Sequence, residues 1–430
     1  MAPEHKFPPI EGIRWFNVCI LVGTPLIALY GLLFVPFDRR TLVFAFAYYL
    51  FSMIGITAGF HRLWSHRSYN ACFPLQIFLI LGGTSSVQGS CYWWARGHRS
   101  HHRWTDTDKD PYDSTRGLAW THIGWIVCKS KLRRGAVDAS DLGKDPLVQW
   151  THRYYFPLAA LFGYALPALI PALWKDALGG CCFSAALRLT VAHHCTFAIN
   201  SIAHYLGSTP YDDALSPRDH FLSGKYLTMS EPLLRVFIAA ILTMGEGYHN
   251  FHHQFPMDYR NAILWYQWDP TKWFIALCKY LGLASNLRVF PSNEIAKGAL
   301  TMKLKHLKQV QESLVWPPTV EDLPVVTWES FQQESKTRPL ILVSGFIHDV
   351  SAFLEQHPGG VTYLTRNSGI DVTASFFGGV YRHSNAAHNL MSMMRVGVLV
   401  GGGCPPDQTI PPSQVLFVAT RHEDEGISSK

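Results

Sequence analysis

The chain has 430 residues, of which 48% are hydrophobic and only 16% are charged. This composition excludes a disordered or fibrous protein, and the charged fraction lies well below the roughly 25% found in soluble globular proteins. Together with 14 Trp, 18 Tyr and 26 Phe, the charge deficit indicates a membrane protein. The net charge of +6 is small for this length and comes without a long Lys/Arg run, which argues against a nucleic-acid partner.

In chain order, four apolar runs are long enough, or nearly so, to cross a hydrocarbon core, which takes about 20 helical residues. These predicted membrane helices are residues 15–37, 41–60, 155–174 and 180–206. The fourth contains Arg188 and three histidines, which interrupt its apolar character. A further run, 71–89, is interrupted by Pro74 and several glycines, so we expect a buried or re-entrant helix there.

The segment between the second and third runs, residues 61–154, carries thirteen Lys and Arg. The positive-inside rule places such a segment in the cytoplasm, and an even number of spans returns everything after Leu206 to the same side. We therefore expect a mainly α-helical membrane protein, with four transmembrane helices, a cytosolic helical cap and both termini in the cytosol. In this topology two distant groups of histidines share one face of the membrane.

Eight of the 21 histidines fall into three short boxes: His61-Arg-Leu-Trp-Ser-His66, His98-Arg-Ser-His101-His102 and His249-Asn-Phe-His252-His253. Imidazole suits iron, copper, zinc and nickel. In the second and third boxes the i, i+3, i+4 spacing places three rings on one face of a helical turn. The i, i+5 spacing of the first box makes its two rings diverge unless the helix ends between them.

A ninth candidate, His204, follows Asn200 by four residues at the end of the fourth run. An ionisable residue near a membrane segment is a functional candidate by default, so we predict a ligand role for His204 and a water-holding role for Asn200. Eight or nine imidazoles exceed what one metal can coordinate, which implies two metals. Only Glu246-Gly-Tyr-His249 fits the Glu-x-x-His motif of soluble di-metal bundles, and those need two such pairs. A histidine-rich dimetal centre is expected, with structural zinc open on ligand type alone.

The three boxes, together with Asn200-Ser-Ile-Ala-His204 and Glu246-Gly-Tyr-His249, resemble those of the membrane fatty acyl-CoA desaturases. The resemblance covers about residues 15–292 and is strongest to the fungal acyl-CoA Δ9-desaturases. It implies two iron ions, with Asn200 holding a metal-bound water. The iron ligands that it implies are His61, His66, His98, His101, His102, His204, His249, His252 and His253.

From about Thr319 the pattern becomes mixed α/β, and residues 325–331, 341–343 and 346–350 are predicted as short strands and turns. The segment 349–360, which contains His357-Pro-Gly-Gly, resembles the haem-binding core of cytochrome b5. The resemblance implies a haem b with His357 and His383 as axial ligands, and His388 is a lower-ranked rival for the second position. The expected pocket walls are Phe353, Leu354, Phe376 and Phe377.

The predicted domains are a membrane desaturase domain (1–300), a linker (301–318), a cytochrome b5-like haem domain (319–400) and a tail (401–430) that resembles nothing familiar. An apolar stretch around residues 224–239 makes the connection before the third box longer than is usual in the family. This stretch is either a lipid-facing insertion or an artefact of how the sequence was assembled.

A CoA thioester joins an anionic head to an apolar tail, so basic residues at a cytosolic mouth and an apolar tunnel are expected. The candidates for phosphate contacts are Arg96, Lys129, Lys131, Arg133, Arg134 and Arg153. The cluster 129–134 is equally suited to lipid headgroups. Trp93, Trp94 and Phe197 are predicted to line the tunnel. Tyr49, about 18 Å along a helix from His61, is predicted to help close its far end.

The resemblance implies an acyl-CoA Δ9-desaturase that inserts a cis double bond between C9 and C10 of palmitoyl- or stearoyl-CoA. The implied partners are O2, membrane lipid and NADH-cytochrome b5 reductase, and the implied location is the endoplasmic reticulum membrane. Two alternatives remain. One is a related di-iron hydroxylase or a desaturase of other regiochemistry, and the other is a membrane haem electron carrier with a disabled di-iron site.

Overall fold

The computed structural model describes residues 8–219, 243–378 and 383–401. The chain forms two compact units, residues 1–307 and 308–430, and each is described by itself. The first unit is mostly helical, and the second combines short helices with a four-stranded sheet. The apolar stretch 224–239 and the tail beyond Gly401 lie outside the described residues.

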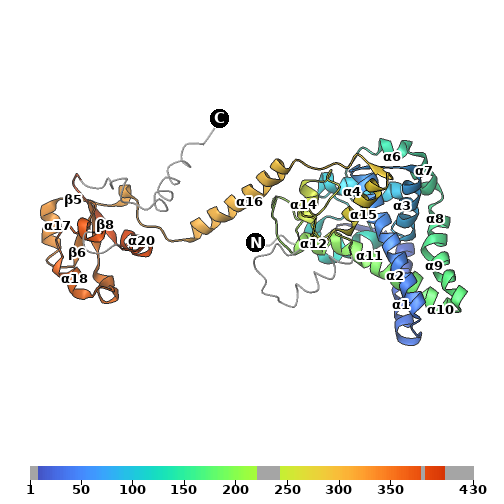
Figure 1. Cartoon of the computed structure of the whole chain (residues 1–430), viewed down its shortest axis with the longest axis horizontal. Helices are drawn as coiled ribbons and strands as arrows, with labels where there is room; N and C mark the ends of the chain where they lie inside the picture. The colour runs from blue at the N-terminus through green and yellow to red at the C-terminus, as the bar shows by residue number, and fades with distance from the viewer. Residues whose placement is uncertain (1–7, 220–242, 379–382, 402–430) are drawn as a thin grey trace. The chain divides into compact units, whose positions relative to one another are not determined.

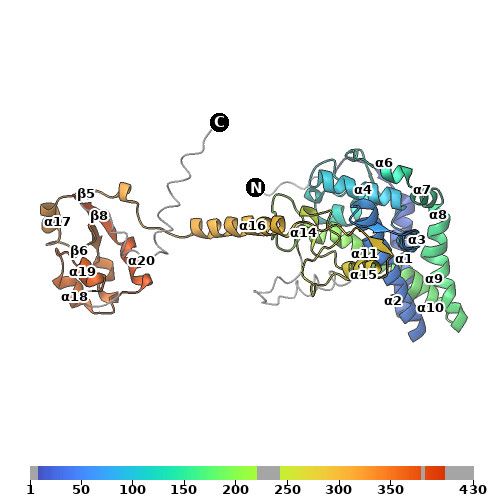
Figure 2. The same ribbon diagram turned by 45° about the horizontal axis from the view of Figure 1, so that its top comes forward.

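Three helical segments are long and apolar enough to cross a membrane. The first is α1 (Trp15–Phe34), and the second is the continuous helix formed by α2 (Arg39–Ile54) and the π-helix η1 (Gly55–Ser65). The third consists of α8 (Tyr155–Leu158), η4 (Ala159–Ala165), α9 (Leu166–Leu169) and η5 (Ile170–Trp174). Figures 1 and 2 show α1, α2 and the run from α8 to α10 side by side.

The fourth predicted span corresponds to α10 (Ala177–Gly179), η6 (Gly180–Leu187) and α11 (Arg188–Asn200), followed by α12 (Ile202–Tyr205). This run is not one of the three candidate spans among the described residues, so a fourth crossing stays a prediction. It does pack directly against the first span, because a Cβ on Gly31 of α1 would lie 2.4 Å from the Cβ of Cys182.

In α1, small residues make the helix contacts and large apolar residues face outward. The buried residues of α1 are Thr24, Ala28 and Gly31, whereas Leu29 and Leu33 are at least half exposed. Membrane helices associate through small residues because lipid tails are as apolar as a leucine side chain. The interrupted run 71–89 forms α3 (Phe73–Ser85), whose 13 residues are too few to cross a bilayer.

Arg188 is buried inside this helical bundle and joins several of its helices. Its guanidinium donates to the Ser52 hydroxyl (2.8 Å) and to the carbonyls of Ser85 (3.1 Å) and Gly163 (2.7 Å). It also lies 5.0 Å from the ring centroid of Tyr48. In the described part of the chain no ion pair involves Arg188, so dipoles and an aromatic face compensate its charge.

Replacing Arg188 by methionine is expected to destabilise the first unit by about 2–4 kcal/mol, because it leaves buried hydroxyl and carbonyl groups without a donor. Thermal unfolding of the detergent-solubilised protein measures the effect. Arg40→Met is the matched control, since Arg40 is largely exposed and forms its ion pair with Asp38 at the start of α2. Equal melting temperatures for the two variants would contradict the role given to Arg188.

The other elements of the first unit carry and connect the histidine boxes. Strand β1 (Ile10–Ile13) pairs with β3 (Cys128–Ser130), and β2 (Asn70–Ala71) pairs with β4 (Ala284–Ser285), both antiparallel. The helices are α4 (Cys91–Trp104), η2 (Ser114–Arg116), η3 (Trp120–Gly124), α5 (Trp125–Val127), α6 (Ser140–Lys144), α7 (Pro146–Arg153), α14 (His249–Gln254), α15 (Pro270–Tyr280) and α16 (Ser292–Ser313). The main core packs Phe60, Leu79, Ala95, Val148 and Ile275 together and fixes η1 against α3, α4, α7 and α15.

The second unit is built on a sheet with strand order β5-β8-β7-β6. The strands are β5 (Val325–Val326), β6 (Leu340–Val343), β7 (Phe346–Asp349) and β8 (Arg395–Leu399), all antiparallel except the β5–β8 pair. The helices are η7 (Val320–Asp322), α17 (Trp328–Glu334), η8 (Ser351–Gln356), α18 (Val361–Arg366), α19 (Thr373–Phe376) and α20 (Asn385–Met393).

One predicted strand is mostly helical. Within residues 325–331 only Val325–Val326 forms a strand, and α17 begins at Trp328. The Thr327 side chain accepts a hydrogen bond from the backbone N–H of Ser330 (3.2 Å), so a capping threonine outweighs the β propensity of its neighbours. The other two predicted strands appear as β6 and β7.

Candidate metal centre

The structure brings together all nine histidines proposed as ligands, in two groups. The first group contains His61, His66, His98, His102 and His252, and the second contains His101, His204, His249 and His253. Within each group the ligand nitrogens lie within 4.8 Å of one another. Four segments of the chain contribute: η1 and the residue after it, α4, α12 and α14.

Helices α4 and α14 each contribute to both groups. In α4, His98 and His102 belong to the first group and His101 to the second. In α14, His249 and His253 (i and i+4) belong to the second group, and His252 (i+3) belongs to the first. Because successive residues are about 100° apart around a helix, positions i+3 and i+4 point in different directions. The three rings of a box therefore share a helical turn but not a metal group.

The first box agrees with the prediction about helix geometry. The helix ends at Ser65, between His61 and His66, and their ring centroids are only 4.9 Å apart. The stretch Gly55–Ser65 is π-helical, and the N–H of His66 donates to the carbonyl of His61 (3.1 Å). Since a π-helix bonds each residue to the fifth one before it, residues i and i+5 lie on the same side.

Six close contacts between Nε2 atoms define the two groups. The Nε2 of His252 lies 2.9 Å from the Nε2 atoms of His61 and His102, and further contacts of 2.9–3.3 Å join the remaining rings. One ring nitrogen carries at most one proton, so a single Nε2 cannot donate to two others. Several lone pairs therefore face each other in a buried space, an arrangement that a bound cation stabilises.

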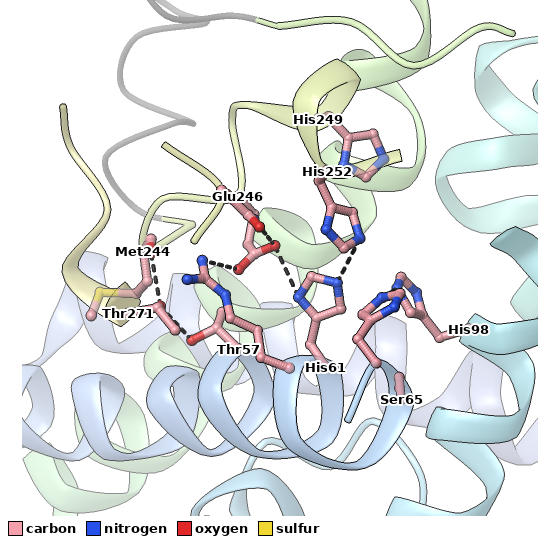
Figure 3. A network of polar contacts seen from close by, with 12 residues as sticks. Thr57, His61, Ser65, His98, Met244, Glu246, His249, His252 and Thr271 are labelled. Atoms are coloured by element: carbon pink, nitrogen blue, oxygen red, sulfur yellow. Dashed lines mark hydrogen bonds and ion pairs between the residues drawn. The ribbon is translucent and has the colours of Figure 1, made fainter. Parts of the chain in front are cut away.

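A carboxylate fixes the orientation of His61 from outside the first group. The Nδ1 of His61 lies 3.0 Å from Oε2 of Glu246, and since a carboxylate only accepts, Nδ1 carries the proton and Nε2 faces the other rings. Glu246 in turn accepts from Arg62 (3.0 Å) and from the side-chain amide of Asn261 (2.7 Å). Figure 3 shows His61 held between Glu246 and His252.

The charges around Glu246 keep it ionised. Burial alone would raise its pKa, but His61 and Arg62 outweigh burial and hold the pKa of Glu246 at about 2, below its ordinary 4.5. Arg62 is itself buried and also donates to both carboxylate oxygens of Asp269 (2.9 and 3.1 Å). This ionic network links η1 to the segment before α14 and to the start of α15.

The second group has its own outer contacts. The Nδ1 of His101 lies 2.9 Å from Oδ1 of Asp110, which again directs Nε2 inward. The Nδ1 of His204 lies 2.6 Å from the hydroxyl of Ser216, and that hydroxyl donates to Oδ1 of Asp106 (2.6 Å). Such outer contacts orient metal-binding histidines and fix their tautomer.

Burial keeps most of these imidazoles neutral. It lowers the pKa values well below the ordinary 6.5, and nearby histidines lower them further. A neutral ring nitrogen is the form that binds a metal. The residues affected are His66, His98, His102, His249, His252 and His253.

Two cavities lie beside the histidines. The smaller, about 40 Å³, is lined by His61, His98 and His249 together with residues of α2, η1 and α11. The larger, about 440 Å³, is lined mainly by apolar and aromatic side chains. The two share the lining residues Trp94, Thr196 and Asn200, so the large cavity leads toward the metal groups.

The structure places some predicted substrate residues in the cavity walls and others elsewhere. Four line the large cavity: Trp93, Trp94, Phe197 and Arg134, whose guanidinium lies 5.0 Å from the Trp93 ring centroid. Among the described residues the lining does not include Arg96, Lys129, Lys131, Arg133, Arg153 or Tyr49. Lys129 pairs instead with Glu11 (3.5 Å). Tyr49 is buried next to Met53, which lines the small cavity.

The second unit orients two further histidines. The Nδ1 of His357 lies 3.1 Å from the carbonyl oxygen of Gly360, and the Nδ1 of His383 lies 2.9 Å from that of Phe376. A carbonyl only accepts, so each ring carries its proton on Nδ1. Phe376 stacks on His383 at a centroid distance of 4.5 Å and also contacts His388 at 4.8 Å.

Residues 40–283 match the fatty acid desaturase family, and residues 327–400 match the cytochrome b5-like haem/steroid binding domain. The chain belongs to the fatty acid desaturase family. This desaturase also carries a small C-terminal cytochrome b5-like domain, and its apolar helices agree with a membrane protein.

Similar proteins of this desaturase family cover most of the chain. A probable acyl-CoA desaturase of Schizosaccharomyces pombe is 46% identical over 91% of this chain and 78% of its own length. Acyl-CoA desaturase 1 of Saccharomyces cerevisiae is 42% identical over 90% of this chain and 74% of its own length. The stearoyl-CoA desaturase of Sus scrofa is 37% identical over 70% of this chain and 80% of its own length.

The desaturase family is a di-iron family, and the residues present fit two irons. Neutral imidazole suits iron, and the Nε2 lone pairs converge on two points. A structural zinc site takes four ligands, whereas the first group offers five imidazoles. The second group offers four, and Asn200 lines the small cavity beside His249.

The cytochrome b5 domain implies haem, and its histidines also fit. With Nδ1 of His357 and His383 committed to carbonyl oxygens, Nε2 is the nitrogen suited to an axial bond. Phe376 is buried, and Leu354 and Phe377 pack against the same apolar cluster, as expected for pocket walls. Phe353 lies 5.9 Å from the ring of His357.

The sequence analysis did not identify the residues that contact the metal-binding histidines from outside the two groups. Glu246 was noticed through its Glu-x-x-His spacing, but its partner is His61, in a helix far away in the sequence. No spacing signal connects Asp110 with His101 as a pair, or Ser216 with His204. An acidic residue near a histidine box is the one signal that could have suggested such contacts.

Proposed function

We propose that this protein is an acyl-CoA Δ9-desaturase. It takes palmitoyl- or stearoyl-CoA, O2, two electrons and two protons, and returns the cis-9 acyl-CoA and two waters. The electrons come from NADH through NADH-cytochrome b5 reductase and the fused haem domain. The observation that carries the proposal is the small cavity between the histidines and α2, which shares lining residues with a large, mainly apolar cavity.

The protein's own residues bind and orient the acyl-CoA. Arg134, held over Trp93 in the wall of the large cavity, supplies a cation for the anionic head. Trp94 and Phe197 line the path of the acyl chain. The reacting carbons would pass through the small cavity, where Met53, Ile56 and Ile199 lie beside His61 and His249.

Two bound irons would supply the O2-dependent chemistry that removes hydrogen from an unactivated C–H bond. His61, His66, His98, His102 and His252 would hold one iron, and His101, His204, His249 and His253 the other. Asn200 would hold a water at the second. His357 and His383 would hold the haem.

We further propose an endoplasmic reticulum location with four spans, in which both termini and the active site face the cytosol. The thirteen Lys and Arg of residues 61–154 support this orientation. The predicted domain limits also stay proposals, and α16 runs across residue 300, where the desaturase domain was predicted to end.

Complementation of an unsaturated-fatty-acid auxotroph, followed by fatty-acid profiling, tests the function. Growth with accumulation of cis-9 C16 and C18 acids is the expected result. Hydroxylated acids or a double bond elsewhere would instead support a related di-iron enzyme. Failure to grow, with haem bound and no further iron, would support the electron carrier.

Tyr49 is expected to limit the length of the acyl chain. It is buried beside Met53, Ala192 and Cys195, and its hydroxyl contacts the Cys195 thiol at 3.7 Å. Tyr49→Ala opens space at the side of the small cavity formed by Met53, so the preferred acyl chain should lengthen. Competition between acyl-CoA thioesters of different length measures this. Tyr30→Ala, an exposed tyrosine on α1, is the control; a Tyr49 variant with the same selectivity as the control would refute the assignment.

A further inference from the structure

His122 and His194 form a histidine pair outside both metal groups. His122 lies in η3 and His194 in α11, and the Nε2 of His122 is 3.1 Å from the Nδ1 of His194. The contacts that define the two iron groups span 2.9–3.3 Å, so this separation is of the same size. The pair also flanks Phe197, with ring centroids 5.8 and 5.9 Å away.

The hydrogen bonds behind His122 set its tautomer. The hydroxyl of Ser201 donates to the carbonyl of Phe197 (2.7 Å), so its single proton is committed. The hydroxyl oxygen must therefore accept from Nδ1 of His122, which lies 2.9 Å away. This leaves a lone pair on the Nε2 of His122, aimed at His194. Ser201 thus has the role toward His122 that outer partners have toward metal-bound histidines.

His194 can adopt the complementary form. Without a metal, its Nδ1 carries the proton and donates to His122. Its side chain is exposed, so the proton can move to Nε2 on the outer side, leaving a second lone pair beside the first. A metal ion is usually 2.0–2.1 Å from an imidazole nitrogen. If it bound both nitrogens, which are 3.1 Å apart, the N–metal–N angle would be roughly 100°. This value lies between the angles of square-planar and tetrahedral coordination.

We propose that His122 and His194 bind a divalent transition-metal ion, with water in the other positions, separately from the two irons. Imidazole favours zinc, copper, cobalt and ferrous iron over magnesium or calcium. A bound ion joins η3 to α11 across Phe197, which lines the large cavity. The ion should therefore restrict that wall and inhibit turnover reversibly; this second effect rests on the proposed function.

Equilibrium dialysis of the iron- and haem-loaded protein against Zn²⁺, with zinc and iron both counted by mass spectrometry, tests the site. The expected result is one saturable zinc per chain with no loss of iron. His194→Gln and His122→Gln should abolish this zinc, and Ser201→Ala should weaken its binding by about 10-fold. His306→Gln, an exposed histidine on α16, is the matched control and should bind zinc like the unaltered protein.

The outcomes separate the site from the enzyme's activity. Zinc that binds only as iron is released, or that persists in His194→Gln, overturns the site. If zinc binds as expected but does not slow desaturation in the unaltered protein, the inhibitory role is wrong. Absence of desaturation even without zinc would count against the proposed function and leave the binding result to decide the site.

Discussion

His252→Ala is expected to remove iron from the first group and lower desaturation by more than about 100-fold, while the haem stays bound. His252 is the ring whose Nε2 contacts both His61 and His102 at 2.9 Å, so its loss opens the centre of the group. The removal of even an outer partner of a metal ligand commonly costs 10–100-fold, and the removal of a ligand should cost more. Elemental analysis measures iron, and the haem absorption band measures haem.

A substitution of a proposed haem ligand tests whether the two cofactors can be lost separately. His357→Ala should abolish haem absorption and leave the non-haem iron in place, because the second unit is compact in its own right. His306→Gln on α16 should change neither cofactor. Loss of both cofactors in His252→Ala would indicate misfolding, and retention of all non-haem iron would refute the ligand assignment.

Glu246→Ala is expected to weaken iron binding by about 10–100-fold, although Glu246 is not itself proposed as a ligand. It would remove the acceptor that holds His61 in its productive tautomer and leave buried Arg62 with Asp269 as its remaining carboxylate. Glu246→Gln should be milder, because an amide oxygen can still accept from His61. Iron affinity, measured by titration of the iron-free protein, is the readout.

Asp258→Asn is the matched control for this prediction. Asp258 is also buried and also pairs with an arginine, Arg260, but its described contacts include no histidine. It should lower thermal stability without a selective loss of iron affinity. Equal loss of iron affinity in the Asp258 and Glu246 variants would show that Glu246 acts only through general stability.

The Glu246–Arg62 pair also sets an acid limit. Because the folded-state pKa of Glu246 is about 2 and its ordinary value is 4.5, its ionisation stabilises the fold above about pH 4.5. That contribution is lost as the pH falls from 4.5 toward 2. Removal of Glu246 should therefore flatten the pH dependence of stability in this acidic range.

The histidine boxes could be predicted because their chemistry is encoded in local spacing. A box with histidines at i, i+3 and i+4 on a helix predicts nearby rings whatever surrounds it, and His98, His101 and His102 are such a case. The division of a box between two metal groups could not be predicted, because it depends on where α14 lies against α4. The contact of Glu246 with His61 likewise requires the packing of segments about 185 residues apart.

Residue type was a weaker guide to the substrate cavity. Arginines near the second box were proposed as a set, yet in the described chain Arg134 lines the large cavity whereas Arg96 and Arg133 do not. Which basic side chain reaches a cavity depends on loop geometry that composition does not encode. The predicted fourth span illustrates the same limit, since Arg188 lowers its apolar character but is buried among hydroxyl and carbonyl groups.

The π-helical stretch Gly55–Ser65 serves both the membrane span and the metal centre. This helix is part of a candidate membrane span and ends where His61 and His66 face the first group. Deleting one residue between them would favour ordinary 3.6-residue turns and restore i, i+4 spacing, but would also shift the ring positions against α4. Evolutionary change in this stretch should therefore favour substitution over insertion or deletion, because a gained or lost residue alters lipid depth and metal geometry simultaneously.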